Sequence, residues 1–383
     1  MQKTVAILGA TGSVGMQALS VAQSRGYKID FMTADKNVKD MESYARKFLP
    51  SAVAMADADA ASDLKHRLAD TSVQVLCGDS GIVEGIEKSK SETVLNAIIG
   101  KAGLIPTLAV IDSKKRLALA NKESLVVAGE IVMSRAAKNG AEIIPVDSEH
   151  SAIFQSLSAG KRSEIKRLIL TASGGPFFGK TKEELKEVTL AQTLAHPTWK
   201  MGKKITVDSA TLMNKGFEVI EAAHLFDVGV EKIDVVVHRE SILHSAVEYI
   251  DNTVIGEFSV PEMRMCVQYA VDYPNRLAGD FGSLDLIKCG KLSFFAPDTE
   301  AFPLLALAAR AMSLGGAMPA ILNAADEVAV DAFLKEQISF FEISEVVSSA
   351  FERMVGSDGK TLEEILYFDK EARKITKNII EEK

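Results

Sequence analysis

A short apolar run near the start of the chain passes directly into a glycine-rich loop, and this order constrains the fold more than any other feature. Val5–Leu8 precedes Gly9-Ala10-Thr11-Gly12-Ser13-Val14-Gly15, and a helical pattern begins at Ser13. Glycines at such a turn let the backbone approach a pyrophosphate, which then lies on the helix N-terminus. The spacing differs from the commonest G-x-G-x-x-G fingerprint, and a tight turn without a ligand is the alternative. Because strand, loop and helix follow in order, we expect a dinucleotide site.

Short apolar runs alternate with helical patterns as far as about residue 145. The helical patterns include Ser13–Ser24 and Glu123–Lys138. This alternation is typical of βαβ units and predicts a Rossmann-like, doubly wound parallel sheet in an α/β protein. The expected strands are Val5–Leu8, Ile29–Met32, Ala52–Ala56, Val73–Leu76, Val94–Ile99 and Leu117–Ala120.

The pattern changes between about residue 142 and residue 271, where apolar runs end in polar clusters. Ser245–Ile250 and Val254–Ser259 flank a polar turn and predict an antiparallel hairpin. This part is expected to be a second α/β domain. The other strands expected in it are Ile143–Val146, Leu168–Leu170 and Ile205–Val207.

Prolines and glycines between residues 272 and 300 predict a long connection. Helical patterns follow at about 302–313, 318–335, 342–356 and 360–378, and short joints between them predict a helical bundle. We therefore expect a dinucleotide-binding domain (1–146), a catalytic domain that binds metal and substrate (147–271), a linker (272–300) and a C-terminal helical domain (301–383).

Composition excludes several classes of protein. A chain of 383 residues has room for two or three domains. Its net charge of −8 argues against nonspecific nucleic-acid binding, which needs clustered positive charge. Cys77, Cys266 and Cys289 are too few and too scattered for a disulfide framework or a zinc site. A reducing, cytoplasmic setting is the simplest interpretation.

No stretch predicts a membrane span or a signal peptide. The most apolar stretch, Phe302–Ala325, is interrupted by Arg310, Pro319 and Asn323 and is typical of a buried helix pair. The apolar run Val5–Leu8 is too short for a signal sequence. We expect neither a membrane partner nor a nucleic-acid partner.

The end of the second strand should contact the adenosine ribose. Asp35 stands 20 residues after Gly15, where an acid hydrogen-bonds a ribose 2′-hydroxyl and favours NAD. Lys36 and Asn37 are suited to a 2′-phosphate instead. These residues leave the choice between NAD and NADP open.

Asp147-Ser148-Glu149-His150 directly follows an expected strand. Two carboxylates one residue apart can converge on a divalent cation, and hard oxygen ligands favour Mg²⁺ or Mn²⁺ over Zn²⁺. A helix N-terminus with acidic residues that complement its dipole is the alternative.

The segment Asp208–Glu218 offers further candidate ligands, and we expect it to join a strand to a helix. Ser209, Asn214 and Lys215 at a helix start are good phosphate partners. Glu218 lies one turn further on and could reach the same cation as Asp147. An ordinary ion pair on a solvated helix is the alternative.

Three further motifs have both a functional and a structural interpretation. Ser173-Gly174-Gly175-Pro176 suits a phosphate contact or an ordinary turn. The loop 193–203 holds His196 and Trp199, the only tryptophan; it predicts either a lid over a ligand or a packed loop. For a lid, we expect the indole to be largely solvated when the loop is open. Lys122 suits substrate or nicotinamide, or a charge cluster at a helix start.

His238 and His244 end another expected strand. At this spacing histidines are more often structural than metal-ligating.

Together these motifs resemble the 1-deoxy-D-xylulose 5-phosphate reductoisomerase family over nearly the whole chain. The motifs that carry the resemblance are Gly9–Gly15, Asn121-Lys122-Glu123-Ser124, Pro145-Val146-Asp147-Ser148-Glu149-His150, Ser173-Gly174-Gly175-Pro176, His196-Pro197-x-Trp199 and Val207–Glu218.

The resemblance implies an NADP-dependent oxidoreductase of non-mevalonate isoprenoid biosynthesis, assembled as a homodimer. Such an enzyme converts 1-deoxy-D-xylulose 5-phosphate to 2-C-methyl-D-erythritol 4-phosphate. A divalent cation, Mg²⁺ or Mn²⁺, assists a carbon-skeleton rearrangement, and NADPH then delivers hydride.

The resemblance also implies roles for individual residues. The metal ligands would be Asp147, Glu149 and Glu218, and the catalytic set would add Lys122 and His150. The substrate contacts would be Lys122, Ser148, Glu149, Ser173, His196, Trp199, Ser209, Asn214, Lys215 and Glu218. The cofactor contacts would be Thr11, Gly12, Ser13, Val14, Lys36, Asn37, Asn121, Glu123, Gly202 and Met263.

Two positions depart from the pattern of the family. Many members have glycine where this chain has Asp35, and an acid there repels a 2′-phosphate. Many also have proline after His238, where this chain has Arg239.

Two alternatives use the same glycine loop. An aspartate-semialdehyde-type dehydrogenase needs an active-site cysteine, and none of the three cysteines lies in a strand-to-helix nucleophile turn with a plausible base. A non-catalytic dinucleotide sensor explains the loop but not three carboxylates and a phosphate set. Metal-dependent NADPH oxidation with the ketose phosphate separates all three hypotheses.

Overall fold

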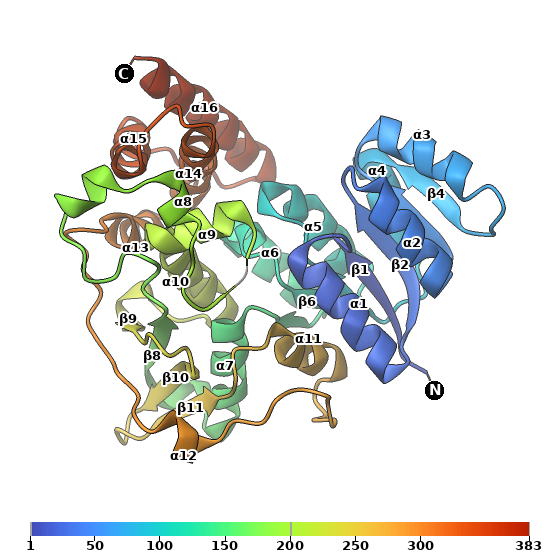
Figure 1. Ribbon diagram of the computed structural model, residues 1–383, viewed down its shortest axis with the longest axis horizontal. Helices are drawn as coiled ribbons and strands as arrows, with labels where there is room; N and C mark the ends of the chain where they lie inside the picture. Colours follow the sequence, from blue (N-terminus) through green and yellow to red (C-terminus); the bar gives the residue numbers. More distant parts are fainter. Residues whose placement is uncertain (1, 200, 383) are drawn as a thin grey trace. The chain divides into compact units, whose positions relative to one another are not determined.

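The computed structural model describes residues 2–199 and 201–382. Contacts divide the chain into two compact units. Unit 1 consists of Met1–Ser124, Val132–Ser151 and Glu262–Gly282. Unit 2 consists of Leu125–Ile131, Ala152–Pro261 and Ser283–Lys383. Figure 1 shows the elements of both units in the colours of the sequence. The four domains expected from the sequence stay a prediction.

A parallel sheet of seven strands forms the centre of unit 1, which confirms the predicted Rossmann-like α/β fold. Its order is β4-β3-β2-β1-β5-β6-β7. The runs are apolar throughout because helices cover both faces of such a sheet. The strands are β1 (Thr4–Leu8), β2 (Lys28–Ala34), β3 (Ala52–Met55), β4 (Gln74–Cys77), β5 (Thr93–Asn96), β6 (Arg116–Leu119) and β7 (Ile143–Pro145).

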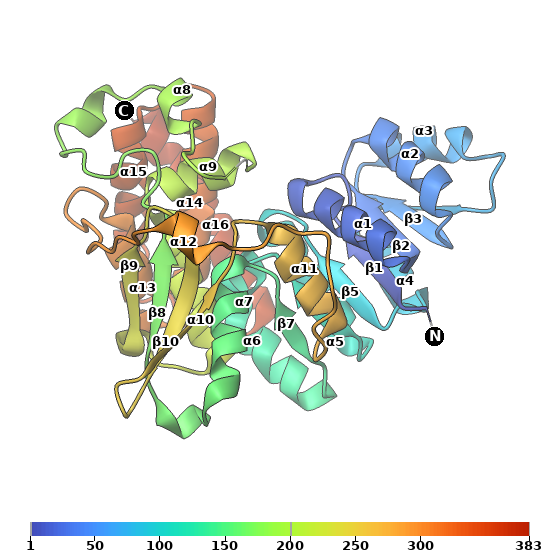
Figure 2. The same cartoon turned by 60° about the horizontal axis from the view of Figure 1, so that its bottom comes forward.

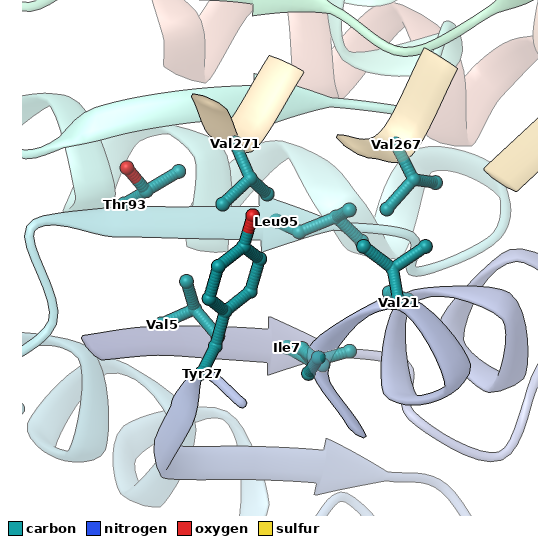
Figure 3. Close-up of a pocket in the computed structure, with 10 residues that line it drawn as sticks. Val5, Ile7, Val21, Tyr27, Thr93, Leu95, Val267 and Val271 are labelled. Carbon is teal, nitrogen blue, oxygen red and sulfur yellow. The ribbon is translucent and has the colours of Figure 1, made fainter. Parts of the chain in front are cut away.

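Side chains of β1 and β2 show that helices cover both faces of this sheet. Val5 and Ile7 of β1 line a small apolar pocket with residues of α1 (Ser13–Arg25) and α11 (Met263–Asp272). In Figure 3, Val267 and Val271 of α11 lie above Tyr27 and the strands. Phe31 of β2 pairs with Ala6, whose side chain points to the other face. There the Phe31 ring lies against Gly85 of α4 (Gly78–Lys88).

The remaining helices of unit 1 connect successive strands. α1 and α11 lie side by side in both ribbon views (Figures 1 and 2) and contact one another. α6 (Glu123–Asn139), whose residues Leu125–Ile131 belong to unit 2, bends at Ala128, where φ is −144° and ψ is 40°. The others are α2 (Val38–Phe48), α3 (Ala58–Arg67) and α5 (Leu104–Asp112).

The strand order reverses between β1 and β5, because the chain builds β1 to β4 outward and then returns to the other side of β1. At such a switch point the two neighbouring loops leave in opposite directions and open a crevice at the carboxyl ends of the strands. The glycine loop follows β1 and therefore lies at this crevice.

Unit 2 contains a mixed sheet in the order β11-β10-β8-β9. The hairpin of β10 (Leu243–Tyr249) and β11 (Val254–Phe258) is antiparallel, as predicted. β8 (Ile165–Ala172) pairs antiparallel with β10 and parallel with β9 (Ile233–Val237). α7 (Ser148–Ser156) precedes this sheet in the chain.

The strand predicted at Ile205–Val207 is wrong, because these residues belong to helix α9 (Lys203–Ala210). The β-branched run favoured a strand. Tertiary packing decides otherwise, since Thr206, Val207 and Ala210 are buried and the Thr206 hydroxyl donates to the Gly202 carbonyl at 2.8 Å. Asp208 therefore lies in the last turn of a helix and does not follow a strand.

Helices α13 (Leu304–Leu314), α14 (Met318–Leu334), α15 (Phe340–Glu352) and α16 (Leu362–Glu381) form the predicted bundle. α14 packs against α15 and α16, and α13 packs against α10 (Met213–Phe226). The stretch Phe302–Ala325 is thus a buried helix pair, as expected. Two single-turn helices, α8 (Leu190–Thr193) and α12 (Leu286–Cys289), complete unit 2.

Among the described residues, no helix combines the length and the apolarity needed to cross a membrane. All three cysteines are free thiols.

Candidate active site

The glycine loop of unit 1 leaves the start of α1 open to a ligand. A Cβ atom on Gly15 would lie 2.1 Å from the Gly9 carbonyl oxygen, so the loop and the helix touch without room for a side chain. The N-cap residue Gly12 makes no side-chain cap, and the first turn of α1 carries no acidic residue. An uncapped, non-acidic helix N-terminus suits a pyrophosphate.

Gly9 fixes the loop between two neighbouring strands. Its φ is +79°, and a Cβ atom there would lie 2.6 Å from the carbonyl oxygen of Ala97, just after β5. Its N–H donates to the Thr33 hydroxyl at the end of β2, at 2.9 Å. Thr33 was not among the expected site residues; its position at the carboxyl end of the neighbouring strand was the available signal.

The residues expected at the adenosine ribose follow β2. Asn37 is the N-cap of α2: its side chain accepts from the Asp40 N–H at 3.2 Å and donates to the Asp40 carboxylate at 2.7 Å. The ammonium group of Lys36 lies 3.6 Å from the Asp57 carboxylate and its side chain is 73% exposed. Lys36 can thus turn toward a ligand at little cost, whereas Asn37 already holds the helix start.

Asn121 ties two loops of unit 1 together at the same edge of the sheet. Its amide nitrogen donates to the carbonyls of Ile98 and Gly100 at 2.7 and 2.9 Å, and to the Glu123 carboxylate at 2.9 Å. Its amide oxygen accepts from the Ser124 N–H at 2.9 Å. A buried amide with these partners fixes the loop after β5, so its contact with a cofactor would run through that loop.

The predicted acidic motif follows β7, the edge strand of the sheet. The Lys122 ammonium group lies 2.6 Å from a carboxylate oxygen of Asp147, and both side chains are largely buried. The Ser148 hydroxyl donates to the Glu149 carboxylate at 2.5 Å. His150 is fully buried. The ammonium group of Lys122 thus contacts Asp147, the first of the predicted metal ligands.

A second carboxylate–cation contact lies in unit 2, at the start of α10. Asn214 donates to Glu218 at 2.6 Å, and the Lys215 ammonium group contacts the other carboxylate oxygen of Glu218. Lys215 and Glu218 are 3% and 1% exposed. Leu212, with φ +60°, separates α9 from α10, and such strained residues are concentrated at functional sites.

Ser173 and His196 are brought together as one pair. The Ser173 hydroxyl lies 3.0 Å from His196 Nε2. His196 Nδ1 accepts from the backbone N–H groups of Thr198 and Trp199 at 3.2 and 2.9 Å. Because Nδ1 accepts, the neutral ring carries its proton on Nε2 and donates it to Ser173. Burial, with the charge of Arg239 as a smaller cause, lowers the pKa of His196 to about 4.

Ser209 lies beside this pair. A Cβ atom on Gly175 would be 2.6 Å from the Ser209 carbonyl oxygen, so the turn after β8 packs on the end of α9. The expected phosphate contacts Ser173, His196, Ser209, Asn214 and Lys215 all belong to unit 2.

Within the loop 193–203, the described contacts of His196 are with Ser173, Thr198 and Trp199. Trp199 is partly buried, and its ring centroid lies 6.4 Å from that of His244. The expectation of a largely solvated indole concerns the open loop and stays a prediction. Gly202 is the N-cap of α9. Lys200 lies outside the described residues.

His238 has the structural role that its spacing favoured. Its Nε2 accepts from the N–H groups of Ile242 and Leu243 at 3.1 and 3.2 Å, and its Nδ1 lies 2.9 Å from the Ser293 carbonyl. His244 is buried inside β10 and does not follow a strand end. Arg239, between them, contacts the turn after β8 and was not among the expected site residues.

Each unit thus contains a part of the expected site. Unit 1 holds the glycine loop, the ribose end, Lys122, the acidic motif and Met263, the first residue of α11. Unit 2 holds Glu218, the phosphate set, the tryptophan loop and Gly202.

Comparisons with known proteins agree over most of the chain. The family model "1-deoxy-D-xylulose 5-phosphate reductoisomerase" matches residues 5–129. Two further models, for C-terminal domains of the same family, match residues 143–226 and 258–375.

Relatives and solved structures match at nearly full length. The 1-deoxy-D-xylulose 5-phosphate reductoisomerase of Acetivibrio thermocellus is 49% identical over 99% of this chain and 100% of the relative. That of Ruminiclostridium cellulolyticum is 45% identical with the same coverage. The Zymomonas mobilis structure, in complex with NADPH, has a TM-score of 0.93 and 40% identity and covers both chains completely.

A second solved structure, a DOX-P reductoisomerase in complex with NADPH, fosmidomycin and magnesium, has a TM-score of 0.94 and 38% identity. The match covers 99% of this chain and 98% of that one. The resemblance inferred from the motifs is confirmed, and the chain belongs to the 1-deoxy-D-xylulose 5-phosphate reductoisomerase family.

Proposed function

We propose that this chain converts 1-deoxy-D-xylulose 5-phosphate to 2-C-methyl-D-erythritol 4-phosphate, with NADPH as reductant and a divalent cation as cofactor. Its place is in non-mevalonate isoprenoid biosynthesis. The observation that carries the proposal is the state of two acidic groups, Asp147 and Glu218, each in contact with a lysine. Carboxylate oxygens are the ligands that a divalent cation prefers, and solved structures of the family hold magnesium, so these acidic groups fit a metal site.

Asp147, Glu149 and Glu218 would hold the metal. All three offer carboxylate oxygens, the ligands that Mg²⁺ and Mn²⁺ prefer. When bound, the cation polarises the carbonyl and hydroxyl oxygens of the substrate, and NADPH supplies the hydride. Hydrogen bonds orient two of these carboxylates: Ser148 donates to Glu149, and Asn214 donates to Glu218.

Lys122 and His150 would act beside the acidic motif. The Lys122 ammonium group can stabilise negative charge on a substrate oxygen, since it already lies 2.6 Å from the Asp147 carboxylate. His150, fully buried one residue after Glu149, would orient the motif from within.

The Ser173–His196 pair, with Ser209, Asn214 and Lys215, would bind the substrate phosphate. Two hydrogen-bond donors at 3.0 Å, one neutral imidazole and one hydroxyl, can both turn to a phosphate oxygen. Phosphate contacts far from the reacting carbons supply binding energy that positions those carbons.

The glycine loop would bind the cofactor pyrophosphate. Thr11, Gly12, Ser13 and Val14 lie at the uncapped start of α1. Of the other expected cofactor contacts, Lys36 and Asn37 lie at the ribose end, and Met263 would pack on the nicotinamide. Asn121, Glu123 and Gly202 complete the expected set.

One assay tests the proposal as a whole: NADPH oxidation by the purified chain with the ketose phosphate, with and without Mg²⁺ or Mn²⁺. Turnover that needs substrate and metal together, with 2-C-methyl-D-erythritol 4-phosphate as the product, is expected. NADPH oxidation that is independent of the metal, or the absence of the product, would refute it.

A homodimer and a cytoplasmic location belong to this proposal. β11 is an edge strand, and Val254 and Phe258 on it are 52% and 46% exposed, which suits a second copy of the chain. Free thiols suit a reducing compartment. Light scattering coupled to gel filtration should give twice the chain mass.

The cofactor should be NADPH rather than NADH. Lys36 is exposed enough to pair with a 2′-phosphate, while Asp35 opposes it. Asp35→Gly should raise the ratio of kcat/KM for NADPH over NADH about two- to fivefold, the effect of removing one exposed like-charge contact. Asp59→Ala, an exposed acid on α3, is the control and should leave the ratio unchanged. A wild-type ratio near one would mean that Asp35 governs the pocket.

The loop 193–203 should close over the substrate. Trp199 is the only tryptophan, so its emission reports on this loop. A phosphonate analogue with Mg²⁺, at fixed NADPH, should bury the partly exposed indole further and reduce acrylamide quenching. Trp199→Ala should raise the KM for the substrate. Emission and quenching that do not respond to saturating ligand would identify Trp199 as a packed surface residue.

A further inference from the structure

The turn after β8 presents two carbonyl oxygens to one side chain from another part of unit 2. Gly174 and Gly175 both have positive φ, +76° and +65°, a conformation that glycine adopts without strain. The turn directs the carbonyls of Ser173 and Gly175 at Nη1 of Arg239, which donates to them at 2.8 and 2.6 Å. One guanidinium nitrogen therefore bridges both ends of the turn.

Arg239 is held in this position from other sides as well. Its guanidinium lies 5.2 Å from the ring centroid of Phe178, a cation–π distance. The neighbouring Glu240 accepts from Ser293 at 2.6 Å and lies 3.1 Å from His238. A half-buried arginine with these contacts has one orientation rather than many.

The same turn carries the phosphate set expected for this family. The Ser173 hydroxyl accepts from the Gly175 N–H at 3.2 Å and lies 3.0 Å from His196 Nε2. The charge of Arg239 reaches His196, since it contributes to the lowered pKa of that ring after burial. The guanidinium thus lies close enough to act on this pair through its field as well as through the turn.

We propose that Arg239 is a positioning residue of the phosphate subsite: it clamps the Ser173–Gly175 turn so that the Ser173 hydroxyl faces His196, and its permanent charge favours a dianionic ligand group there. The inference rests on the proposed function of this pair and adds a residue to it.

The chemistry of the Ser173–His196 pair explains why a nearby positive charge would help it to bind phosphate. A neutral imidazole and a hydroxyl are donors without charge, whereas a phosphate dianion is bound best where a fixed positive charge is near. Without Arg239, the two carbonyls of the turn would face each other with no donor between them, and the turn would open. Both effects weaken binding of the phosphate more than they affect the reacting carbons.

The test compares Arg239→Gln and Arg239→Lys with a matched control, Arg310→Gln. Arg310 also lies over an aromatic ring, 5.4 Å from the Phe351 centroid, and pairs with Glu352, but on the exposed side of α13. Steady-state kinetics of the full-length enzyme with Mg²⁺ give KM for substrate, KM for NADPH and kcat. Inorganic phosphate as a competitive inhibitor probes the subsite without the reacting carbons.

Arg239→Gln should raise the KM for substrate and the inhibition constant of phosphate about tenfold, while KM for NADPH and kcat change less than about threefold. Arg239→Lys should lie between wild type and the glutamine variant, since it keeps the charge and can donate to a carbonyl. Arg310→Gln should match wild type.

Three outcomes would overturn the inference: unchanged constants in Arg239→Gln, a lysine variant no better than the glutamine variant, or a parallel rise of KM for NADPH that marks a general structural defect. A wild-type enzyme without turnover would instead refute the proposed function itself, so the two failures are distinguishable.

Discussion

Glu218→Gln should lower kcat/KM at limiting Mg²⁺ by about a hundredfold or more, because even residues that only support metal ligands cost 10–100-fold in metal affinity or activity when replaced. NADPH should bind with unchanged affinity, since Glu218 is not among the expected cofactor contacts. The measurement is kcat/KM for the substrate at a series of Mg²⁺ concentrations and saturating NADPH, alongside NADPH binding by fluorescence.

Glu218→Gln tests the negative charge of this side chain, because glutamine has nearly the same shape as glutamate. Glutamine keeps an oxygen that can accept from Asn214, which donates to Glu218 at 2.6 Å. It removes the negative charge that Lys215 contacts and that a divalent cation needs. Glu218→Asp keeps the negative charge on a shorter side chain. Added Mn²⁺ or Mg²⁺ should therefore restore more activity to the aspartate variant than to the glutamine variant.

Glu363→Gln, an exposed acid in the first turn of α16, is the matched control and should behave as wild type. Unchanged turnover of Glu218→Gln at limiting Mg²⁺ would remove Glu218 from the metal site. A loss of both activity and NADPH binding would point to misfolding rather than to the metal.

The dinucleotide-binding half of the fold follows from short-range features of the sequence. Strand β1, the glycine loop and α1 occupy 22 consecutive positions, Thr4 to Arg25, and each has its own local signal. The apolar runs that follow are short and flanked by helices, and few arrangements other than a parallel sheet bury them on both faces. Such features need no knowledge of distant residues.

The error at Ile205–Val207 shows where local signals fail. A run of three β-branched residues favours a strand. This run nevertheless lies in α9, because the buried face of the helix packs in unit 2. One helical signal was present: Lys204 and Asp208 are four residues apart with opposite charges, which is the spacing of one helical face.

The candidate site was predictable as a set of residue types, but not as a set of contacts. Ser173 and His196 are 23 residues apart and meet at 3.0 Å only because the turn after β8 and the following loop fold back on each other. Arg239 was visible in the sequence only as a departure from a family pattern. Its contact with the carbonyls of Ser173 and Gly175 depends on backbone atoms, which carry no sequence signal.

The buried charges around Lys204 should have a large effect on the stability of the fold. The Lys204 ammonium group lies 2.6 Å from Asp208 in its own helix and 2.9 Å from Asp326 in α14, and the two acidic side chains are 4% and 0% exposed. It also lies 4.9 Å from the ring centroid of Phe217. This contact joins α9, which carries Ser209, to the helical bundle.

Lys204→Met should lower the free energy of unfolding by about 3–5 kcal/mol, the cost of leaving buried carboxylates without their cation. Lys335→Met is the matched control: its pair with Asp331 has the same 2.6 Å distance and four-residue spacing, but both side chains are more than 60% exposed. It should cost no more than about 0.5 kcal/mol. Urea denaturation followed by circular dichroism measures both.

The pH dependence of the loss identifies its cause. Burial raises the pKa of Asp326, and Lys204 opposes that rise; without the lysine the folded-state pKa rises further above its unfolded value. A carboxyl group of this kind stabilises the fold at low pH and loses that contribution as pH rises through the folded pKa. The deficit of Lys204→Met relative to wild type should therefore be larger at about pH 8 than at about pH 5, and Asp326→Asn in the same chain should recover part of it. A deficit that is equal at both pH values, and that Asp326→Asn does not relieve, would assign the loss to the packing of the lysine stem on Phe217 and not to charge.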